Sequence, residues 1–497
     1  MAMSETRETA TVTGLKPSGI RKLCWLAAAA GLAALTLIIA PQTGLPLIGQ
    51  RLLGILVFTV VVWATEAVPY PVSALLLIVL MTVGGTDEKI ALRQAFNNSL
   101  TGFAGSVPIA VIAGTAFAGV AHTTGLTRRL ICTIMKAVAG AKETAKAERV
   151  LAAMFLAEIP LAFMVPTANG RTGLYISLAE GLKSTFKFSS SDEGGKVNPF
   201  QKAVYIACGV IPSVMGAAFL TAGESTMLAG RLIEEGTKVP QYWANTAMYL
   251  FLPTIFMLGI AWYILKRTFP STVDNIPVGF IDEQLRELGP LTKNEKYVIA
   301  VLAGAILLWA TDRFHHIPAE CILVLASVTL FIPGFGAGNW KRDSKFIAWG
   351  AAMVIAVSTS FAILLSKHGV IKLVAGWIGS AGVESFAGLS IIMAFAMVFM
   401  RLGVASIGGA AALFIPLAVA IGQNAGFPVN KVVAFAWLTY VYCRAGYLLP
   451  QQTAQLITCY EYNYFSRGDL LRVGVPLTLG TLVVYGLWAM FVIPLLV

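Results

Sequence analysis

The sequence is poor in charged residues. Only 12% of its 497 residues are Asp, Glu, Lys or Arg, about half the roughly 25% of soluble domains, and 57% are hydrophobic. A soluble globule needs a charged surface around its core, so the composition excludes one. The chain is also basic, with 36 Lys and Arg against 25 Asp and Glu. In a membrane protein this excess indicates orientation rather than a nucleic-acid partner, because most of the surface faces lipid.

The sequence also lacks the segments of about ten alternating apolar and polar residues that a membrane β-barrel requires. Instead, apolar runs long enough to cross a membrane as helices, at about 20 residues each, recur along the whole chain. Clear examples are residues 23–40, 52–67, 107–135, 244–265, 297–309, 347–365 and 470–497. The sequence therefore predicts an all-α polytopic membrane protein.

Histidine is scarce, and the cysteines form no recognisable pairs. None of the four histidines belongs to an H-E-x-x-H motif, and the six cysteines include no C-x-x-C pair. We therefore expect no disulfide, metal centre or organic cofactor. A membrane-embedded enzyme is a weak alternative, because it needs convergent nucleophiles or metal ligands. A channel is another, but it needs rings of carbonyls or charges from several subunits.

The basic residues are distributed unevenly among the loops. Tracing the spans from the polar tail, residues 1–22, places most Lys and Arg on the side of that tail. The basic loops are residues 7–22, 128–149, 183–202, 266–296, 341–345 and 467–472. The positive-inside rule then predicts a cytoplasmic N-terminus and an outside C-terminus, and we expect a bacterial inner membrane. The polar start also predicts an uncleaved first span rather than a signal peptide.

Two apolar halves, residues 23–265 and 297–497, flank a polar linker at residues 266–296. Each half has two apolar stretches interrupted by Pro, Gly, Ser, Thr or Asn: residues 160–182 and 211–230, then 399–422 and 439–458. Such residues break a helix, and the freed backbone groups are tolerated in a membrane only where they line a cavity. Helix packing through small residues is the alternative explanation. Paired breaks in corresponding positions favour an inverted-repeat transporter with a central binding site.

Three basic residues, Arg171, Arg401 and Arg444, lie outside the loops among apolar or small residues. A cation at membrane depth costs about 2.5 to 3.5 kcal/mol on insertion scales, so it is usually paired, lines a watery cavity or serves a pathway. Snorkelling or helix capping near an interface is the alternative. We expect Arg171 to lie on an anion path, because it belongs to the first broken stretch. The roles of Arg401 and Arg444 stay open.

Residues 63–76, WATEAVPYPVSALL, resemble the Trp-x-Thr-Glu-Ala-Ile-Pro-x-Pro-Val signature of the divalent anion/sodium symporter family. Further segments that resemble the family are TGLTRRL (124–130), LGPLTKNEK (288–296) and YNYFSRGDLLRVGVPL (462–477). The resemblance covers nearly the whole chain after residue 22. It implies about 11 transmembrane helices, two re-entrant hairpins, an elevator-type transport domain that moves against a scaffold, and a homodimer. Glu66, in the signature, is expected to be structural.

The resemblance also assigns boundaries and a binding site. The implied elements are an inner hairpin at about 150–182, a broken helix at about 203–229, an outer hairpin at about 384–422, a second broken helix at about 429–458 and a closing helix at 470–497. In the family, both tips carry Ser-Asn-Thr, whose side chains hold substrate carboxylates, while nearby oxygens hold sodium. The first tip here, PTANGR at 166–171, is similar to the Pro-Ser-Asn-Thr-Ala-Arg form of the citrate/succinate and oxoglutarate/malate exchangers. The second, Ser406-Ile407-Gly408, keeps only the serine.

The expected substrate-binding residues come from both tips and both breaks: Thr167, Ala168, Asn169, Gly170, Arg171, Thr221, Glu224, Ser225, Thr226, Ser406, Ile407, Gly408, Gln451, Gln452 and Thr453. Sodium remains an open alternative near Pro166, Thr167, Asn169, Ala405 and Gly408, although Ala168 and Ile407 replace both family amides. Glu224 is an ionisable group that either pairs with a basic group of the substrate, pairs with Arg171, carries a proton or lies near the outer mouth.

The sequence thus predicts a secondary active transporter of small organic anions. The resemblance implies di- or tricarboxylates as substrates, and the altered tips favour an anion exchanger. Sodium- or proton-coupled symport of a dicarboxylate, sulfate or sulfonate is the alternative. The expected partners are the anion, membrane lipid and a second copy of the chain.

Overall fold

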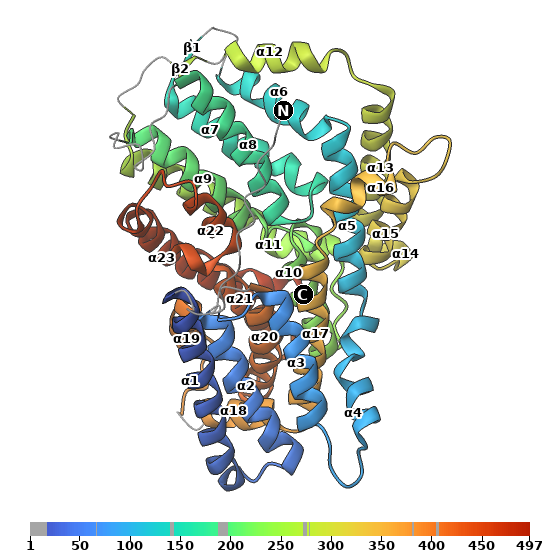
Figure 1. The fold of residues 1–497 in the computed structure, drawn as a ribbon, viewed down its shortest axis with the longest axis vertical. Helices are drawn as coiled ribbons and strands as arrows, with labels where there is room; N and C mark the ends of the chain where they lie inside the picture. The colour runs from blue at the N-terminus through green and yellow to red at the C-terminus, as the bar shows by residue number, and fades with distance from the viewer. Residues whose placement is uncertain are drawn as a thin grey trace, which may run out of the picture.

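The computed structural model describes residues 17–65, 67–139, 144–186, 197–271, 276–277, 279–379, 382–403 and 407–497. Nearly all of its regular structure is helical, as the sequence predicted (Figure 1). Two short strands, β1 (Thr144–Ala145) and β2 (Ile276–Pro277), pair antiparallel and join two loops.

The first half and the linker contain these helices: α1 (Pro17–Ile39), η1 (Ala40–Thr43), α2 (Leu47–Thr65), α3 (Tyr70–Gly84), α4 (Leu92–Ser99), η2 (Thr101–Ala104), α5 (Ser106–Thr123), α6 (Leu126–Ala139), α7 (Ala147–Met164), α8 (Ala168–Phe186), α9 (Pro199–Met215), η4 (Leu220–Ala222), α10 (Glu224–Thr237), α11 (Trp243–Thr268) and α12 (Gly279–Leu288). The second half contains these: α13 (Lys293–Ala310), α14 (Asp312–His315), α15 (Ala319–Leu330), α16 (Trp340–Asp343), η5 (Ser344–Phe346), α17 (Trp349–Lys367), α18 (Val370–Gly379), α19 (Phe386–Gly403), α20 (Ile407–Asn424), α21 (Val429–Arg444), η6 (Pro450–Gln452), α22 (Ala454–Tyr460), α23 (Arg467–Phe491) and α24 (Ile493–Leu496).

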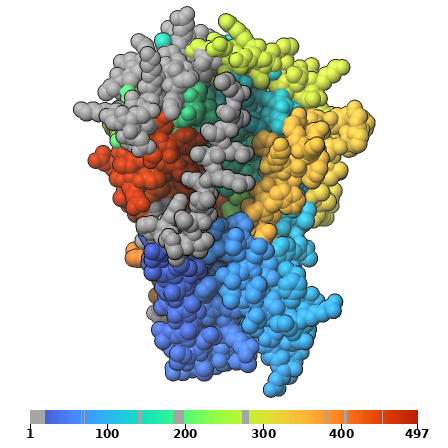
Figure 2. Space-filling model, in the orientation of Figure 1, coloured from blue at the N-terminus to red at the C-terminus, as the bar shows by residue number. Residues whose placement is uncertain are grey.

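Long helices present apolar side chains outward. Six helices in the described ranges are long and apolar enough to cross a membrane. On α23, Leu479, Val483 and Leu487 follow one another at four-residue spacing and are each more than half exposed. An apolar stripe of this kind suits contact with lipid chains rather than water. In Figure 2, the segment from α1 to α4, coloured blue, forms the lower part of the visible surface.

The two halves repeat the same order of elements. In the first half, α5 and α6 precede the helical hairpin α7–α8, the interrupted helix α9–η4–α10 and the long α11. In the second, α17 and α18 precede the hairpin α19–α20, the interrupted helix α21–η6–α22 and the long α23. The first interruption, residues 216–223, contains Gly216 and Gly223, and the second, residues 445–453, contains Gly446 and Pro450. Glycine and proline do not favour a continuous helix.

The two hairpins lie toward opposite ends of the molecule, α7–α8 in the upper part of Figure 1 and α19–α20 in the lower part. The start of α9 lies beside the segment after α22, where the rings of Tyr205 and Tyr464 stack at 4.1 Å between centroids. The end of α20 lies beside the end of α10, where Gln423 Nε2 donates to the carbonyl of Gly236 at 3.2 Å. The interrupted helix of the first half therefore contacts the second half at both of its ends.

Two basic loops that were expected on the same side of the membrane lie together at one end of the molecule. Strand β1 follows α6, and its partner β2 precedes α12, at the top of Figure 1. Ion pairs reinforce this contact, with Lys266 Nζ 2.7 Å from Glu148 Oε2 and Arg128 Nη2 2.8 Å from Glu287 Oε2. The linker is thus joined to the loop between α6 and α7.

Candidate functional site

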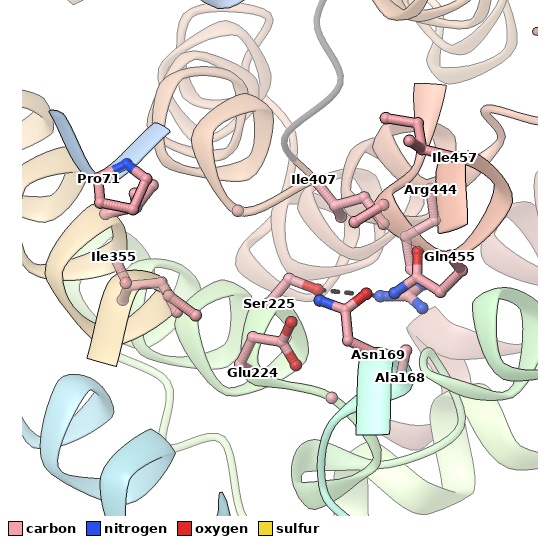
Figure 3. Close-up of a pocket in the computed structure, with 16 residues that line it drawn as sticks. Pro71, Ala168, Asn169, Glu224, Ser225, Ile355, Ile407, Arg444, Gln455 and Ile457 are labelled. Atoms are coloured by element: carbon pink, nitrogen blue, oxygen red, sulfur yellow. Dashed lines mark hydrogen bonds between the residues drawn. The ribbon is translucent and has the colours of Figure 1, made fainter. Parts of the chain in front are cut away.

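A cavity of about 260 Å³ lies where the two hairpins and the two interrupted helices meet (Figure 3). The first residues of four helices line it: Ala168 and Asn169 of α8, Glu224 and Ser225 of α10, Ile407 and Gly408 of α20, and Ala454 and Gln455 of α22. Of these, α8, α10 and α20 are between 14 and 19 residues long. The N-terminus of a helix carries partial positive charge and free N–H groups, so three such ends favour an anion here.

Arg444 is the arginine that lines this cavity. It is the last residue of α21, and its Nη1 donates to Ser225 Oγ at 2.9 Å and to the Tyr440 hydroxyl at 3.0 Å. Its Nη2 donates to the carbonyl of Ser213 at 2.6 Å. No carboxylate within the described ranges forms an ion pair with it. These neutral acceptors hold the guanidinium in place and leave its charge unpaired at the cavity wall.

Glu224 lines the same cavity as the first residue of α10. The described ion pairs do not include it, and its Oε2 is buried without a hydrogen-bond partner. Glu224 is close enough to Arg444 to interact with it electrostatically. The opposite wall is apolar and includes Pro71 of α3 and Ile355 of α17, which lie on the left of Figure 3. The cavity thus combines one cation, one carboxyl group and an apolar surface.

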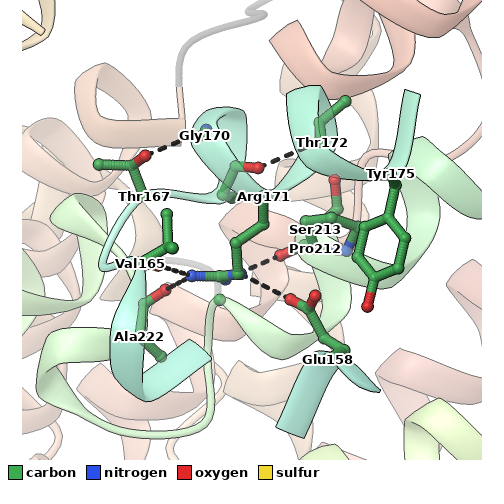
Figure 4. Close-up of polar contacts among 12 residues, drawn as sticks. Glu158, Val165, Thr167, Gly170, Arg171, Thr172, Tyr175, Pro212, Ser213 and Ala222 are labelled. Carbon is green, nitrogen blue, oxygen red and sulfur yellow. Dashed lines mark hydrogen bonds and ion pairs between the residues drawn. The ribbon is translucent and has the colours of Figure 1, made fainter. Parts of the chain in front are cut away.

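Arg171 is not among the residues that line this cavity. Figure 4 shows its guanidinium directed at Glu158, Val165 and Ala222 instead. Arg171 is fully buried, and its Nε is 2.6 Å from Glu158 Oε1 on the other arm of the hairpin. Its Nη1 donates to the carbonyls of Val165, at the hairpin tip, and Ala222, at the end of η4. Because these carbonyls belong to the tip and to the first break, Arg171 holds the two segments together. Glu158 is therefore the carboxylate that pairs with Arg171, and Glu224 is not.

Arg401 occupies a related position in the second half. It lies in the last turn of α19, is 1% exposed, and donates through Nη2 to the carbonyl of Gln452. Gln452 ends η6 just as Ala222 ends η4. Each hairpin therefore carries a buried arginine that is bonded to the last carbonyl of the 3-10 turn in its own half.

The other expected residues hold the turns around the cavity. Thr167 Oγ1 accepts the N–H of Gly170 at 3.0 Å, and Thr221 Oγ1 accepts Trp243 Nε1 at 2.9 Å. Thr226 bonds to the Gly216 carbonyl and the Tyr440 hydroxyl, Gln452 Oε1 accepts two backbone N–H groups, and Thr453 caps α22. Ala405, Ser406 and Glu66, as well as the side chain of Gln451, lie outside the described part. Gln455 lines the cavity although the sequence pattern did not single it out.

The described residues that were named for a possible sodium site supply few side-chain oxygens. Sodium prefers oxygen ligands, yet Ala168 and Ile407 have no side-chain oxygen. The carbonyls of Val165 and Ala222 already accept hydrogen bonds from Arg171, and Thr167 Oγ1 accepts one from Gly170. No group of three or more His, Cys, Asp or Glu side chains in the described ranges is placed to hold a metal ion. Arg171 and Arg401 place guanidinium groups beside the carbonyls of the two breaks.

Comparisons with known proteins agree with this architecture. The chain is 26% identical to a membrane protein of Cupriavidus necator over 474 residues, which span 90% of this chain and 88% of the relative. It is 24% identical to the sodium-dependent dicarboxylate transporter SdcS of Staphylococcus aureus, over 76% of this chain and 73% of that protein. The YdaH transporter of Alcanivorax borkumensis has a similar fold, with a TM-score of 0.54 and 13% identity over 85% of this chain and 96% of that one.

The family profile described as "Sodium:sulfate symporter transmembrane region" matches residues 21–497. The match covers nearly the whole chain, including both hairpins, both interrupted helices and the linker between the halves. The chain therefore belongs to this family of membrane transporters.

Proposed function

We propose that the chain is a secondary active transporter that exchanges small organic anions across the bacterial inner membrane, with Arg444 as the group that binds the anion. The observation that carries this proposal is the convergence of both hairpins, both breaks and an arginine on one cavity, and this arginine has no carboxylate partner among the residues that the structure describes. Di- or tricarboxylates are the first substrate class to test, because relatives such as SdcS are named dicarboxylate transporters.

The charge balance supports an anionic substrate. A cation at membrane depth is costly unless it is paired or lines a watery path. At an effective dielectric constant of about 20, an anion about 4 Å from the guanidinium gains roughly 4 kcal/mol of Coulomb energy. The starts of α8, α10 and α20 add partial positive charge from three directions.

The geometry also supports alternating access. Each half of the chain supplies one hairpin and one interrupted helix to the cavity, while Pro71 of α3 and Ile355 of α17 supply the apolar wall. We propose that the hairpins and interrupted helices move as one body against a scaffold that includes α3 and α17, in a homodimer with a cytoplasmic N-terminus. The basic loops gathered at one end support that orientation.

Exchange without sodium is favoured by the two other buried arginines. Arg171 and Arg401 bond to carbonyls at the two breaks, where a coupled sodium ion would otherwise find oxygen ligands. Because these cations are part of the protein, they do not leave with the substrate. We therefore place no sodium ion in the transport cycle.

The test is counterflow of labelled succinate into liposomes preloaded with unlabelled succinate, in sodium chloride and in choline chloride. We expect the wild type to show equal counterflow in both salts. Arg444→Gln should reduce it at least about 30-fold, because losing one partner of a buried charged contact costs about 2–5 kcal/mol. Sulfate and citrate are measured alongside succinate to identify the substrate class.

The matched control is Arg231→Gln, which removes an arginine on α10 that is 46% exposed and paired with surface glutamates. This variant should exchange anions at the wild-type rate. Normal counterflow by Arg444→Gln would refute the assignment of the anion site. Counterflow that occurs only in sodium chloride would replace exchange with sodium symport.

A further inference from the structure

We propose that Glu224 takes up a proton when an anion binds at Arg444, so that the cavity holds the anion and the proton together. This inference rests on the proposed anion site and adds a coupled ion to it. It also explains why a carboxyl group, that of Glu224, lines a cavity that binds anions.

The first step is the position of the two charges. Glu224 begins α10 in the first half, Arg444 ends α21 in the second, and both line the same cavity (Figure 3). They are the only charged side chains among its described lining residues. They interact electrostatically, but no described ion pair joins them. A bound anion would therefore lie close to both side chains.

The second step is the surroundings of Glu224. Helix α21 presents Tyr440 and Arg444 toward the start of α10, where Tyr440 bonds to Ser225 and Thr226. Helix α20 carries no titratable side chain. Across the tip of the first hairpin, the charge of Arg171 is already paired with Glu158. Arg444 is therefore the one described cation that faces Glu224 across the cavity.

The third step is charge balance. In the empty cavity, the positive charge of Arg444 and the negative charge of an ionised Glu224 cancel. A dianion such as sulfate or succinate at Arg444 would then leave two uncompensated negative charges at membrane depth, which is unfavourable. Protonation of Glu224 removes one of these two charges. Glu224 Oε2, which is buried without a donor, also loses its charge in that state.

The consequence is reciprocal coupling between the anion and the proton. A negative Glu224 a few ångströms from the anion weakens its binding by roughly tenfold to 100-fold at the effective dielectric constant of protein sites. By linkage, the anion favours proton uptake by the same factor. Anion affinity should therefore fall as pH rises, by up to about tenfold per pH unit when one proton accompanies each anion.

The experiment measures binding of sulfate and succinate to purified protein between about pH 5.5 and 8.5. Sulfate is included because its own charge is constant in this range. In the wild type, we expect affinity to fall with pH and about one proton to be taken up per anion, recorded with a pH indicator in weak buffer. Glu224→Gln, which imitates the protonated side chain, should bind both probes independently of pH and without proton uptake.

The matched control is Glu235→Gln on the same helix, whose side chain is 44% exposed, and it should keep the wild-type pH dependence. Sulfate binding by the wild type that is independent of pH, with no proton uptake, would overturn this inference while leaving the anion site intact. Loss of all binding in folded Glu224→Gln would also overturn it, because the uncharged side chain should favour anion binding rather than abolish it. If neither probe binds the wild type at any pH, the proposed anion site fails as well.

Discussion

Arg171 and Arg444 are buried to a similar degree, and their partners give them different roles. Arg171 bonds to Glu158 and to two backbone carbonyls, so its charge is neutralised inside the first hairpin. The described partners of Arg444 are two hydroxyl groups and one carbonyl, so its charge is available at the cavity. The pairing of each arginine, rather than its depth, separates a structural cation from one suited to bind an anion.

Removing one member of the Arg171–Glu158 pair should destabilise the protein. We expect Arg171→Met to lower the free energy of unfolding by about 3–5 kcal/mol, because Glu158 is then left buried without its counter-charge. The double variant with Glu158→Met should recover most of the loss. Unfolding midpoints in detergent measure this. If Arg171→Met is as stable as the wild type, the ion pair does not hold the hairpin tip. Arg444→Gln is the comparison variant and should stay folded.

At this scale, the sequence predicted which residues come together better than what each one does. Arg444 directly precedes the second break in YCRAG, so a search for arginines next to breaks would have selected it. Glu158 carried the same signal as the arginines, a charged side chain inside an apolar run, but nothing in the sequence indicated that it pairs with Arg171. Its role depends on the packing of one hairpin arm against the other, which composition and spacing do not encode.

The two interrupted helices depend on glycines that allow side chains to approach the backbone closely. A Cβ atom at Gly216, in the first break, would overlap the guanidinium of Arg444. A Cβ atom at Gly446, in the second, would crowd the guanidinium of Arg401. Each break thus provides the space that an arginine of the second half occupies.

Gly216→Ala should therefore weaken anion binding. The added methyl group displaces the guanidinium of Arg444 from Ser213 and Ser225, and loss of even one such charged hydrogen bond is worth about 1.5–3 kcal/mol. We expect at least about a tenfold loss of affinity, measured by thermal stabilisation with succinate. Gly173→Ala on α8 is the control, because nothing lies within 4 Å of its new methyl group. Unchanged affinity in Gly216→Ala would place the anion elsewhere.

The expected and observed helices together show which elements can be predicted from sequence patterns. Apolar runs indicated the broken stretches, and the family resemblance implied a hairpin at each of two of them. The structure has α7–α8 at Ala147–Phe186 and α19–α20 at Phe386–Asn424, with residues 404–406 outside the described ranges. Helix α10 extends to Thr237, beyond the expected limit at 229, because its polar last turns continue the helix. Helix α12 lies within the expected linker, residues 266–296, where no helix was predicted because this segment is short and polar.

For the molecule as a whole, two of the segments that resemble the family, residues 124–130 and 288–296, bind each other through hydrogen bonds and an ion pair. We call this contact the clasp. Arg129, in TGLTRRL, bonds through Nε to Glu295 Oε1 at 2.6 Å and through its other nitrogens to the carbonyls of Leu288 and Gly289. Glu295 and Leu288 both belong to LGPLTKNEK. This contact joins α6, which leads into the first hairpin, to the start of α13 in the second half. It therefore couples the two repeats at the end where the linker lies.

The clasp should give the whole protein an acid-sensitive component of stability. Burial of Glu295 would raise its pKa, but hydrogen bonds from Arg129 and Thr292 outweigh this and hold the pKa below its ordinary value. A lowered pKa contributes stability that is complete above the ordinary value and is lost as pH falls through the folded-state pKa. Glu295→Gln should thus cost about 1–3 kcal/mol near pH 7 and much less near pH 3.

Unfolding midpoints at these two pH values measure the difference between the wild type and Glu295→Gln. Asp282→Asn is the matched control, because its ion pair with Lys136 is about half exposed, and exposed pairs contribute about 0–1 kcal/mol. If the destabilisation by Glu295→Gln is equal at both pH values, its cause is lost packing rather than the charge of the carboxylate. The clasp would then align the two halves through shape alone, and its charged residues would be dispensable to the coupling of the repeats.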